Sequence, residues 1–241
     1  MSVVLRPLYG LLWRDPKRRA RKLLQFAEVE ADGGRDINRA AELTRDPRLR
    51  QSYFVHARDE RRHAAMFRKR GLEIRATLPP PIRAKGAGDW IGGGERGLDD
   101  VRVEQESDGA LLAFLHLSEK TAAREFAVYR DVLGHDPETR ALFDRILKDE
   151  EFHMRYTLAE LERVSPDERR AMLWRARRSR LWKAYLRFAS WLAGIIGGAI
   201  LTLQYFILLP PFALLAKRAA QREPEGWAST LTRRVDLRRQ Y

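Results

Sequence analysis

The chain has 241 residues, enough to bury a sizeable core, and it contains no cysteine. The missing cysteines exclude disulfides, thiolate zinc sites, iron–sulfur clusters and cysteine nucleophiles, so a metal can be bound only through oxygen and nitrogen. The formal net charge is +13. Because much of this excess flanks one apolar stretch, we expect anionic membrane lipids rather than nucleic acid as the partner.

Residues 1–15 form an N-terminal arm whose short apolar segment is interrupted by Arg6 and Arg14. No small-residue cleavage site follows, so we do not expect a cleavable signal sequence. Two alternatives stay open for this arm. It is either an amphipathic segment at a membrane surface or a frayed or core-capping arm.

Capping residues followed by proline predict where most of the helices begin. Such pairs favour the first turn of a helix, and they occur at Asp15-Pro16, Asp46-Pro47, Asp136-Pro137 and Ser165-Pro166. A further start is expected at Ser107 or Asp108, and Gly71 and Gly134 are expected to end two helices. The sequence therefore predicts helices at 16–43, 47–70, 108–133, 137–163 and from 166 through 209 onward.

The segment 71–106 holds LPPP, GAG and GGG and has no helical period. A long connection of this kind is required if the second and third helices of a four-helix bundle run parallel. We therefore predict an all-α fold in which two helical hairpins, joined by a crossover, form a bundle over residues 16–163. The interval from Pro47 to Glu60 equals that from Pro137 to Glu150, which suggests an internal duplication.

Two similar strings lie at matching places in the two hairpins, DERRH at 59–63 and DEEFH at 149–153. Positions three apart share a helix face, so Glu60 with His63, and Glu150 with His153, can each present a carboxylate and an imidazole to one point. One such pair is usually part of a solvated helix face. Two pairs at matched depths favour a metal site.

Two metal ions in a bundle core also need an inward glutamate from each of the other two helices. In the first helix the apolar phase favours Glu30, with Glu28 as the alternative, and Gly33 and Gly34 would leave room beside the site. In the third helix the phase favours Glu119. The predicted metal ligands are thus Glu30, Glu60, His63, Glu119, Glu150 and His153.

This set has a charge that suits two divalent cations, because four carboxylates and two neutral imidazoles balance them. Burying four uncompensated glutamates would be very costly. Oxygen ligands with a few imidazoles suit iron or manganese.

The predicted ligand set resembles that of the ferritin-like di-iron carboxylate superfamily, which includes rubrerythrins, demethoxyubiquinone hydroxylases, ribonucleotide reductase small subunits and bacterial multicomponent monooxygenases. The resemblance covers about residues 16–163. It implies a ferritin-like four-helix bundle that holds two iron ions, or one manganese and one iron. It also implies that Glu60 and Glu150 bridge the metals and that Glu30 and Glu119 are terminal ligands.

The string DERRH also resembles the Asp-Glu-x-Arg-His string of the multicomponent monooxygenases. The resemblance implies that Asp59 or Asp149 does not bind the metal itself but accepts a hydrogen bond from a histidine that does. The second string departs from this pattern, because Phe152 stands where the arginine would be.

Other polar and aromatic side chains lie near the predicted ligands in helical phase. His56 and His116 are candidates for an outer proton carrier or an extra ligand, or else hydrogen-bonded core histidines. Tyr53 and Tyr129 are either carriers of oxidising equivalents or packing residues, and packing is the preferred interpretation. We expect His135, beside a turn, to be unrelated.

Residues 188–209 carry no charge and are long enough to cross a hydrocarbon layer of about 30 Å. We predict a basic amphipathic connector at 164–187, a membrane segment at 188–216 that ends or kinks at Pro210-Pro211, and a basic tail at 217–241. A re-entrant hairpin breaking at Gly197-Gly198, or a buried helix of a soluble bundle, are the alternatives.

A stripe of small residues in this segment, Ser190, Gly194 and Gly198, predicts a homodimer through the membrane helix. We place the protein in the cell membrane, with the bundle on the cytoplasmic side.

The expected function is that of a membrane-attached, non-haem di-iron oxidoreductase. It would hydroxylate or desaturate a lipophilic substrate such as a lipid, quinone or fatty acyl chain, using dioxygen and an external electron donor. One alternative is a membrane-tethered ferroxidase or peroxidase. Another is a non-catalytic metal-binding scaffold.

Overall fold

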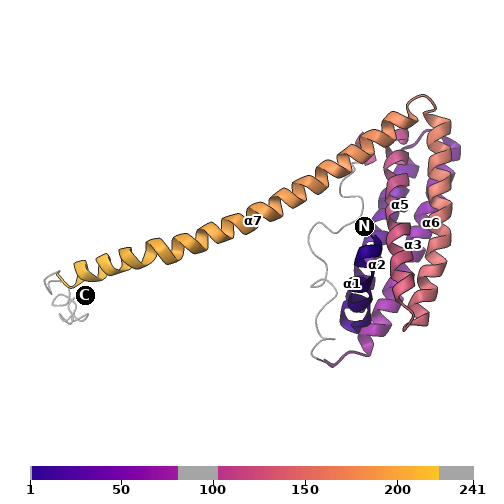
Figure 1. The fold of residues 1–241 in the computed structure, drawn as a ribbon. Helices are drawn as coiled ribbons and strands as arrows, with labels where there is room; N and C mark the ends of the chain where they lie inside the picture. Colours follow the sequence, from indigo (N-terminus) through magenta and orange to yellow (C-terminus); the bar gives the residue numbers. More distant parts are fainter. Residues whose placement is uncertain (1, 81–102, 223–241) are drawn as a thin grey trace, which may run out of the picture. The chain divides into compact units, whose positions relative to one another are not determined.

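The computed structural model describes residues 2–80 and 103–222, and in these ranges the chain forms helices and no strand (Figure 1). The elements are α1 (Ser2–Arg14), α2 (Pro16–Leu43), α3 (Pro47–Ala76), the 3-10 helix η2 (Val103–Gln105), α5 (Asp108–Val132), α6 (Pro137–Val164) and α7 (Arg169–Ala220). Most of the expected crossover, residues 81–102, lies outside the described residues.

The helix starts follow the predicted caps at four places. Side chains of Asp15, Asp46, Ser107 and Asp136 each accept a hydrogen bond from a backbone N–H of the first turn, as an N-cap does. The predicted ranges 16–43, 108–133 and 137–163 therefore agree with α2, α5 and α6 to within one residue.

The prediction that Ser165-Pro166 begins a helix is wrong. The backbone N–H of Ser165 donates to the Leu161 carbonyl and closes α6, and α7 begins only at Arg169. Packing explains the difference. A Cβ on Gly109 would lie 2.6 Å from Ser165 Oγ and 2.7 Å from Met172 Sδ, so this corner is pressed against the start of α5.

Gly71 does not end its helix either, since α3 continues to Ala76. Gly71 is buried against α2, and a Cβ there would lie 2.9 Å from Leu24 Cγ and 3.3 Å from the Ala20 carbonyl oxygen. The glycine serves close approach of two helices rather than a C-terminal turn.

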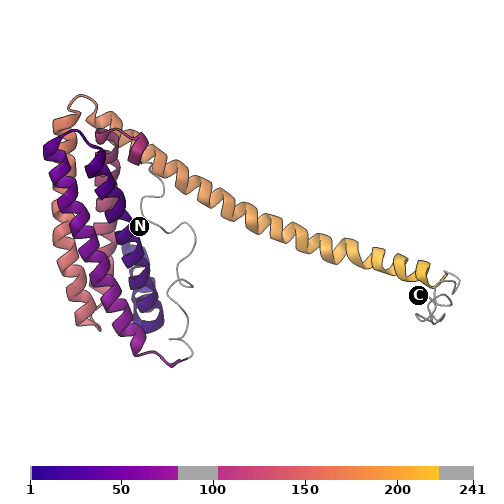
Figure 2. The ribbon, with the colours of Figure 1, turned by 180° about the vertical axis from the view of Figure 1, so that it is seen from behind.

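The helices α2, α3, α5 and α6 lie side by side (Figures 1 and 2), with α2 packed on α3, α5 on α6, and α3 on α6. Two apolar clusters fill the space between them. One cluster is rich in aromatic rings and includes Phe26, Phe67, Phe126 and Phe143. The other is mainly aliphatic and includes Leu49, Leu112, Leu115 and Leu161.

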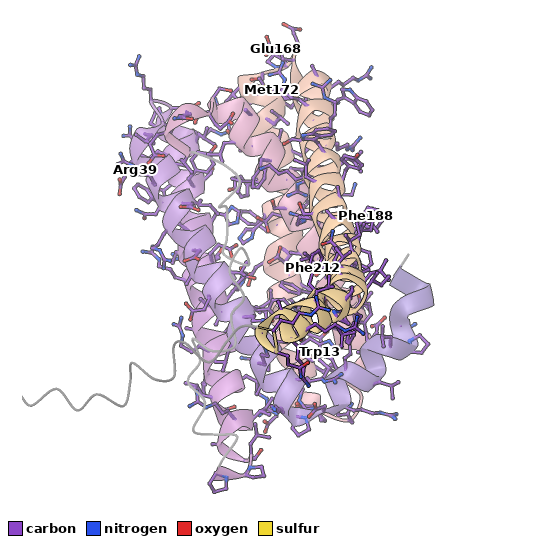
Figure 3. All side chains as sticks on the ribbon, turned by 90° about the vertical axis from the view of Figure 1, so that its left-hand side faces the viewer. Trp13, Arg39, Glu168, Met172, Phe188 and Phe212 are labelled. Atoms are coloured by element: carbon purple, nitrogen blue, oxygen red, sulfur yellow. The ribbon has the colours of Figure 1, made fainter. Side chains whose placement is uncertain are left out.

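The N-terminal arm is helical as α1, which the sequence pattern did not predict. It packs against α5 and α2, and it buries Trp13 in the aromatic cluster, where the ring lies 4.9 Å from that of Tyr129 between centroids. Trp13 lies toward the opposite end of the bundle from Glu168 and Met172 (Figure 3). Of the two alternatives for this arm, the core-capping one holds at its Trp13 end, where the side chain is buried in the core.

The long helix α7 continues without a break through Gly197-Gly198 and through Pro210-Pro211 to Ala220. The re-entrant alternative, with a break at Gly197-Gly198, is therefore wrong. The segment also does not end at Pro210-Pro211, where the sequence predicts an end or a kink. Each proline lacks the N–H that would bond to the carbonyl four residues earlier, so only that hydrogen bond is lost. Ending the helix would leave several backbone groups unpaired, which costs more free energy in apolar surroundings.

The chain divides into two compact units, Met1–Ser179 and Arg180–Tyr241. Within its own unit, none of the residues in the apolar window of α7 is buried. By length and composition, α7 could cross a membrane.

Candidate metal centre

A polar layer separates the two apolar clusters of the first unit. In each of the four long helices the residues of one cluster come before this layer in sequence and those of the other cluster come after it. All six predicted ligands lie in the layer and are buried, with exposures of at most 8%. Glu28, the alternative to Glu30, lies outside it and forms an ion pair with Arg68 at 2.8 Å.

The layer contains two groups of side chains that could each hold a metal ion. Within each group one ligand atom per residue lies within 4.8 Å of all the others. The first group is His56, Glu60, Glu119 and His153, and the second is Glu30, Glu60, His63 and Glu150. Glu60 belongs to both groups, so the predicted six residues come together with His56 as a seventh.

In the first group, two imidazole nitrogens face the same carboxylate oxygen. His56 Nε2 lies 3.0 Å and His153 Nδ1 3.5 Å from Glu60 Oε1. His56 Nε2 is also 3.4 Å from Glu119 Oε1. A carboxylate and an imidazole are thus brought in from α5 and α6 to meet two side chains of α3.

In the second group, His63 Nδ1 lies 3.9 Å from Glu60 Oε2 and 3.9 Å from Glu150 Oε1. The two oxygens of Glu60 therefore face different groups. This is the arrangement expected of a bridging carboxylate. Glu150, the other residue expected to bridge, lies in this group alone.

Outer side chains orient the three imidazoles. His63 Nε2 donates to Asp149 Oδ2 at 3.0 Å, and His153 Nε2 faces Asp59 Oδ2 at 3.5 Å. Each aspartate thus faces the histidine of the other repeat, as the resemblance implied for one of them. His56 Nδ1 lies 2.6 Å from the hydroxyl of Tyr156.

Arg62 links the two aspartates across the site. Its Nη2 lies 3.1 Å from Asp59 Oδ1 and 2.8 Å from Asp149 Oδ2. The corresponding place in the second string holds Phe152, whose side chain is exposed. One guanidinium therefore serves both repeats, and the pair needs no second arginine.

Several buried ligand atoms have no hydrogen-bond partner. They are His63 Nδ1, both ring nitrogens of His153 and Glu150 Oε2. Burying an unpaired polar atom costs about 1–3 kcal/mol, so this concentration of unpaired lone pairs in one layer needs a physical reason. A pair of divalent cations would satisfy His63 Nδ1 and His153 Nδ1, which both face Glu60, whereas His153 Nε2 faces Asp59 outside the site. The oxygen and imidazole donors suit iron or manganese.

The pKa values of the buried glutamates reflect both their burial and the repulsion between neighbouring carboxylates. Burial and the charge of Glu60 hold the pKa of Glu30 well above its usual value, and burial raises the pKa of Glu60 to about 8. Burial and Glu119 likewise raise the pKa of Glu150. Burial opposes ionisation of Glu119 as well, but the hydrogen bond and charge of His56 lower its pKa to about 2.

Burial has the reverse effect on the imidazoles, since it disfavours their cationic form. It lowers the pKa of His63 to about 4 and also lowers that of His153, with His56 adding to the second shift. Both rings are therefore neutral near pH 7. A neutral imidazole is the form that binds metal.

The other histidines and tyrosines considered from the sequence do not belong to either group of candidate ligands. His116 is only partly buried, and its Nδ1 faces the Met154 carbonyl at 3.1 Å. His135 Nε2 faces the Trp13 carbonyl at 3.2 Å. Tyr129 packs in the aromatic cluster, whereas Tyr53 is fully buried with an unpaired hydroxyl in the aliphatic cluster.

Sequence reasoning missed Tyr156 and Arg62. Tyr156 lies three residues after His153, at helical spacing, which is the signal that could have placed it on the site face. Arg62 stands inside the DERRH string, but nothing in the sequence shows that it reaches the aspartate of the other repeat.

Comparisons with known proteins return no match: no family model, no curated protein and no solved structure is similar to this chain.

Proposed function

We propose that the polar layer binds two iron ions and that the protein is a membrane-attached di-iron carboxylate oxidoreductase acting on a lipophilic substrate. The observation that carries the proposal is the shared buried layer, in which four glutamates and three histidines from α2, α3, α5 and α6 converge with their lone pairs turned inward. The proposal includes a ferritin-like arrangement of these four helices, with the metals between the two hairpins.

Iron ions held there would supply the activation and two-electron reduction of dioxygen. The glutamates bind by their oxygens, with Glu60 facing both positions. Asp149 fixes His63 by accepting from its Nε2, which keeps the Nδ1 lone pair turned to the site. The apolar clusters above and below exclude water from the layer.

The substrate class follows from the second unit. The apolar part of α7 offers no buried residue and is long enough to cross a bilayer, with basic residues before and after it. An enzyme held at a bilayer meets lipids, quinones and acyl chains at high local concentration. Hydroxylation of such a substrate consumes one O2, two electrons and two protons and releases one water, whereas desaturation releases two waters. In both reactions an external reductase supplies the electrons.

The proposal is tested with the full chain in lipid nanodiscs, loaded with ferrous iron and supplied with a reductant and dioxygen. We expect two irons per chain and a lipid product that has gained one oxygen atom or lost two hydrogens, detected by mass spectrometry. The Glu60→Gln variant should bind no iron pair and form no product, while Glu28→Gln, on the partly exposed face of α2, should behave as wild type.

Other outcomes contradict particular parts of the proposal. Stoichiometric oxidation of added ferrous iron without lipid change would indicate a ferroxidase, and faster reaction with peroxide than with dioxygen would indicate a peroxidase. A wild-type chain that binds no iron at all would remove the centre itself.

A further inference from the structure

The two repeats contribute unequally to the metal layer, because α3 supplies two histidines and α6 supplies one. His56 stands four residues before Glu60. The corresponding residue, four before Glu150, is Ile146, which is buried in the aromatic cluster and cannot bind a metal. The extra imidazole therefore breaks the symmetry of the duplicated strings.

This asymmetry gives the two groups different donor sets. The group with His56 offers two imidazole nitrogens and the carboxylates of Glu60 and Glu119. The other group offers one imidazole nitrogen, from His63, and three carboxylates. Imidazole favours metals such as iron, cobalt and zinc, whereas carboxylate-rich sites suit manganese and magnesium.

The environment of His56 is that of an oriented ligand. The ring is fully buried, and its Nδ1 is engaged by the Tyr156 hydroxyl at 2.6 Å, which leaves Nε2 facing the Glu60 and Glu119 carboxylates. Its ring stacks on that of His153 with centroids 3.8 Å apart. His63 and His153 show the same pattern, with one ring nitrogen toward an outer partner and the other toward the site.

If His56 were only a hydrogen-bonded core histidine, the unpaired ring nitrogens of His153 beside it would have no explanation. His153 has no hydrogen-bond partner at either ring nitrogen, yet its Nδ1 faces the same Glu60 oxygen as His56. A hydrogen bond from His56 to Glu60 satisfies these two side chains and leaves His153 without a partner. A cation shared by the two nitrogens and the two carboxylates satisfies the whole group.

We infer that His56 is a third imidazole ligand and that the two metal positions are chemically unequal. The His56–His153 position fills first with cobalt or ferrous iron, and the Glu30–His63–Glu150 position fills second. This inference rests on the dinuclear centre of the proposed function.

The test is a titration of the metal-free full chain, in detergent, with Co2+ as the probe. Calorimetry gives the affinities, and the visible absorption of Co2+ reports the number of nitrogen donors. The wild type should bind two Co2+, the first at least about tenfold more tightly than the second. His56→Ile, which copies the residue of the other repeat, should weaken the His56–His153 position by about 10- to 100-fold and shift its absorption. The intrinsic affinity of the Glu30–His63–Glu150 position should stay unchanged, so the two positions become equal or fill in the reverse order.

Two further variants separate ligation from folding. Tyr156→Phe keeps the His56 ring but removes the hydroxyl that orients it, so it should weaken the first step by less than His56→Ile does. His116→Gln alters a histidine of α5 whose Nδ1 faces a backbone carbonyl, and it should change neither step. If His56→Ile does not fold, Tyr156→Phe carries the test.

Two equal Co2+ affinities, unchanged by His56→Ile or Tyr156→Phe, would overturn the unequal positions and leave the dinuclear centre standing. A wild-type chain that binds no Co2+ and no Fe2+ would overturn both proposals.

Discussion

Glu60 belongs to both groups of the buried layer, and its surroundings explain why a cation would stabilise its ionised form. Its Oε1 faces His56 and His153, and its Oε2 faces His63. Without a metal, the carboxylates of Glu60 and Glu30 compete for the same small space, and burial favours the protonated form of both. A carboxylate that is costly to ionise alone becomes favourable to ionise when two cations face it.

These shifts predict how the stability of the metal-free protein depends on pH. The Glu60 carboxyl has a pKa of about 8 when folded against 4.5 as its ordinary value, so the unfolded chain loses this proton first and stability falls as pH rises between these values. His63, with a folded pKa of about 4 against 6.5, costs stability only below pH 6.5. Above pH 6.5 the dependence is therefore set mainly by the buried carboxyls, and the raised pKa values of Glu30 and Glu150 act in the same direction as that of Glu60.

We expect the free energy of unfolding of the metal-free protein to fall by about 1–2 kcal/mol from pH 6.5 to 8, measured by circular dichroism after chelation. The iron-loaded protein, whose glutamates are ionised at both pH values, should lose much less. A metal-free protein that becomes more stable toward pH 8 would contradict the assignment of protonated carboxyls in the layer.

At the scale of the helices, the glycines of α2 and α3 show how packing overrides local preference. Gly34 lies on the site face, where a Cβ would be 3.1 Å from Glu60 Cβ and 3.2 Å from the Ala57 carbonyl oxygen. Gly33, expected to share this role, has no neighbouring atom within 4 Å of such a Cβ. Gly34 and Gly71 together allow α2 and α3 to approach closely at the polar layer and at the aromatic cluster.

Alanine substitutions at the two helical glycines Gly71 and Gly33 should change the free energy of unfolding in opposite directions. Gly71→Ala places a methyl 2.9 Å from Leu24 Cγ and 3.3 Å from a backbone oxygen, so we expect it to destabilise the protein by about 1–3 kcal/mol. Gly33→Ala meets open space and should stabilise it by about 0.5–1 kcal/mol through helix propensity. Thermal unfolding of the two variants beside wild type measures both effects, and equal shifts of the same sign would refute close packing at Gly71.

At the scale of the whole molecule, the two units bury their apolar residues in different ways. The first unit buries two apolar clusters between its own helices, whereas α7 leaves large residues such as Trp182, Ile200 and Leu203 exposed. So extensive an apolar surface is typical of contact with lipid or another protein. The basic residues that precede and follow the apolar segment favour a bilayer with anionic headgroups.

Membrane insertion of α7 is tested by placing charge at its centre. Each arginine at the middle of a spanning helix costs about 2.5–3.5 kcal/mol on insertion scales, so Ile200→Arg combined with Leu203→Arg should release the protein from membranes. Leu72→Arg changes an exposed leucine of α3 and should not. Resistance to alkaline extraction of isolated membranes is the readout, and a double variant that stays as resistant as wild type would rule out insertion through this segment.

Much of the secondary structure and the choice of buried acids could be predicted from the sequence because both depend on local patterns. Aspartate–proline pairs mark three starts that the structure keeps, and helical phase separates Glu30 from Glu28. The misses have a common cause. Gly71, Ser165 and the arm residue Trp13 each have their conformation decided by a residue of another helix, and no local pattern reports that contact.

The sequence by itself determined which side chains face inward and at what depth, since the 3.6-residue period and the capping residues are properties of each helix alone. Only the tertiary structure decided which of these side chains contact one another. It placed each aspartate against the histidine of the other repeat, divided seven candidate ligands into two groups that share Glu60, and brought Tyr156 to His56. Those relations depend on the rotation and height of one helix against the next, which side-chain packing across the whole bundle sets.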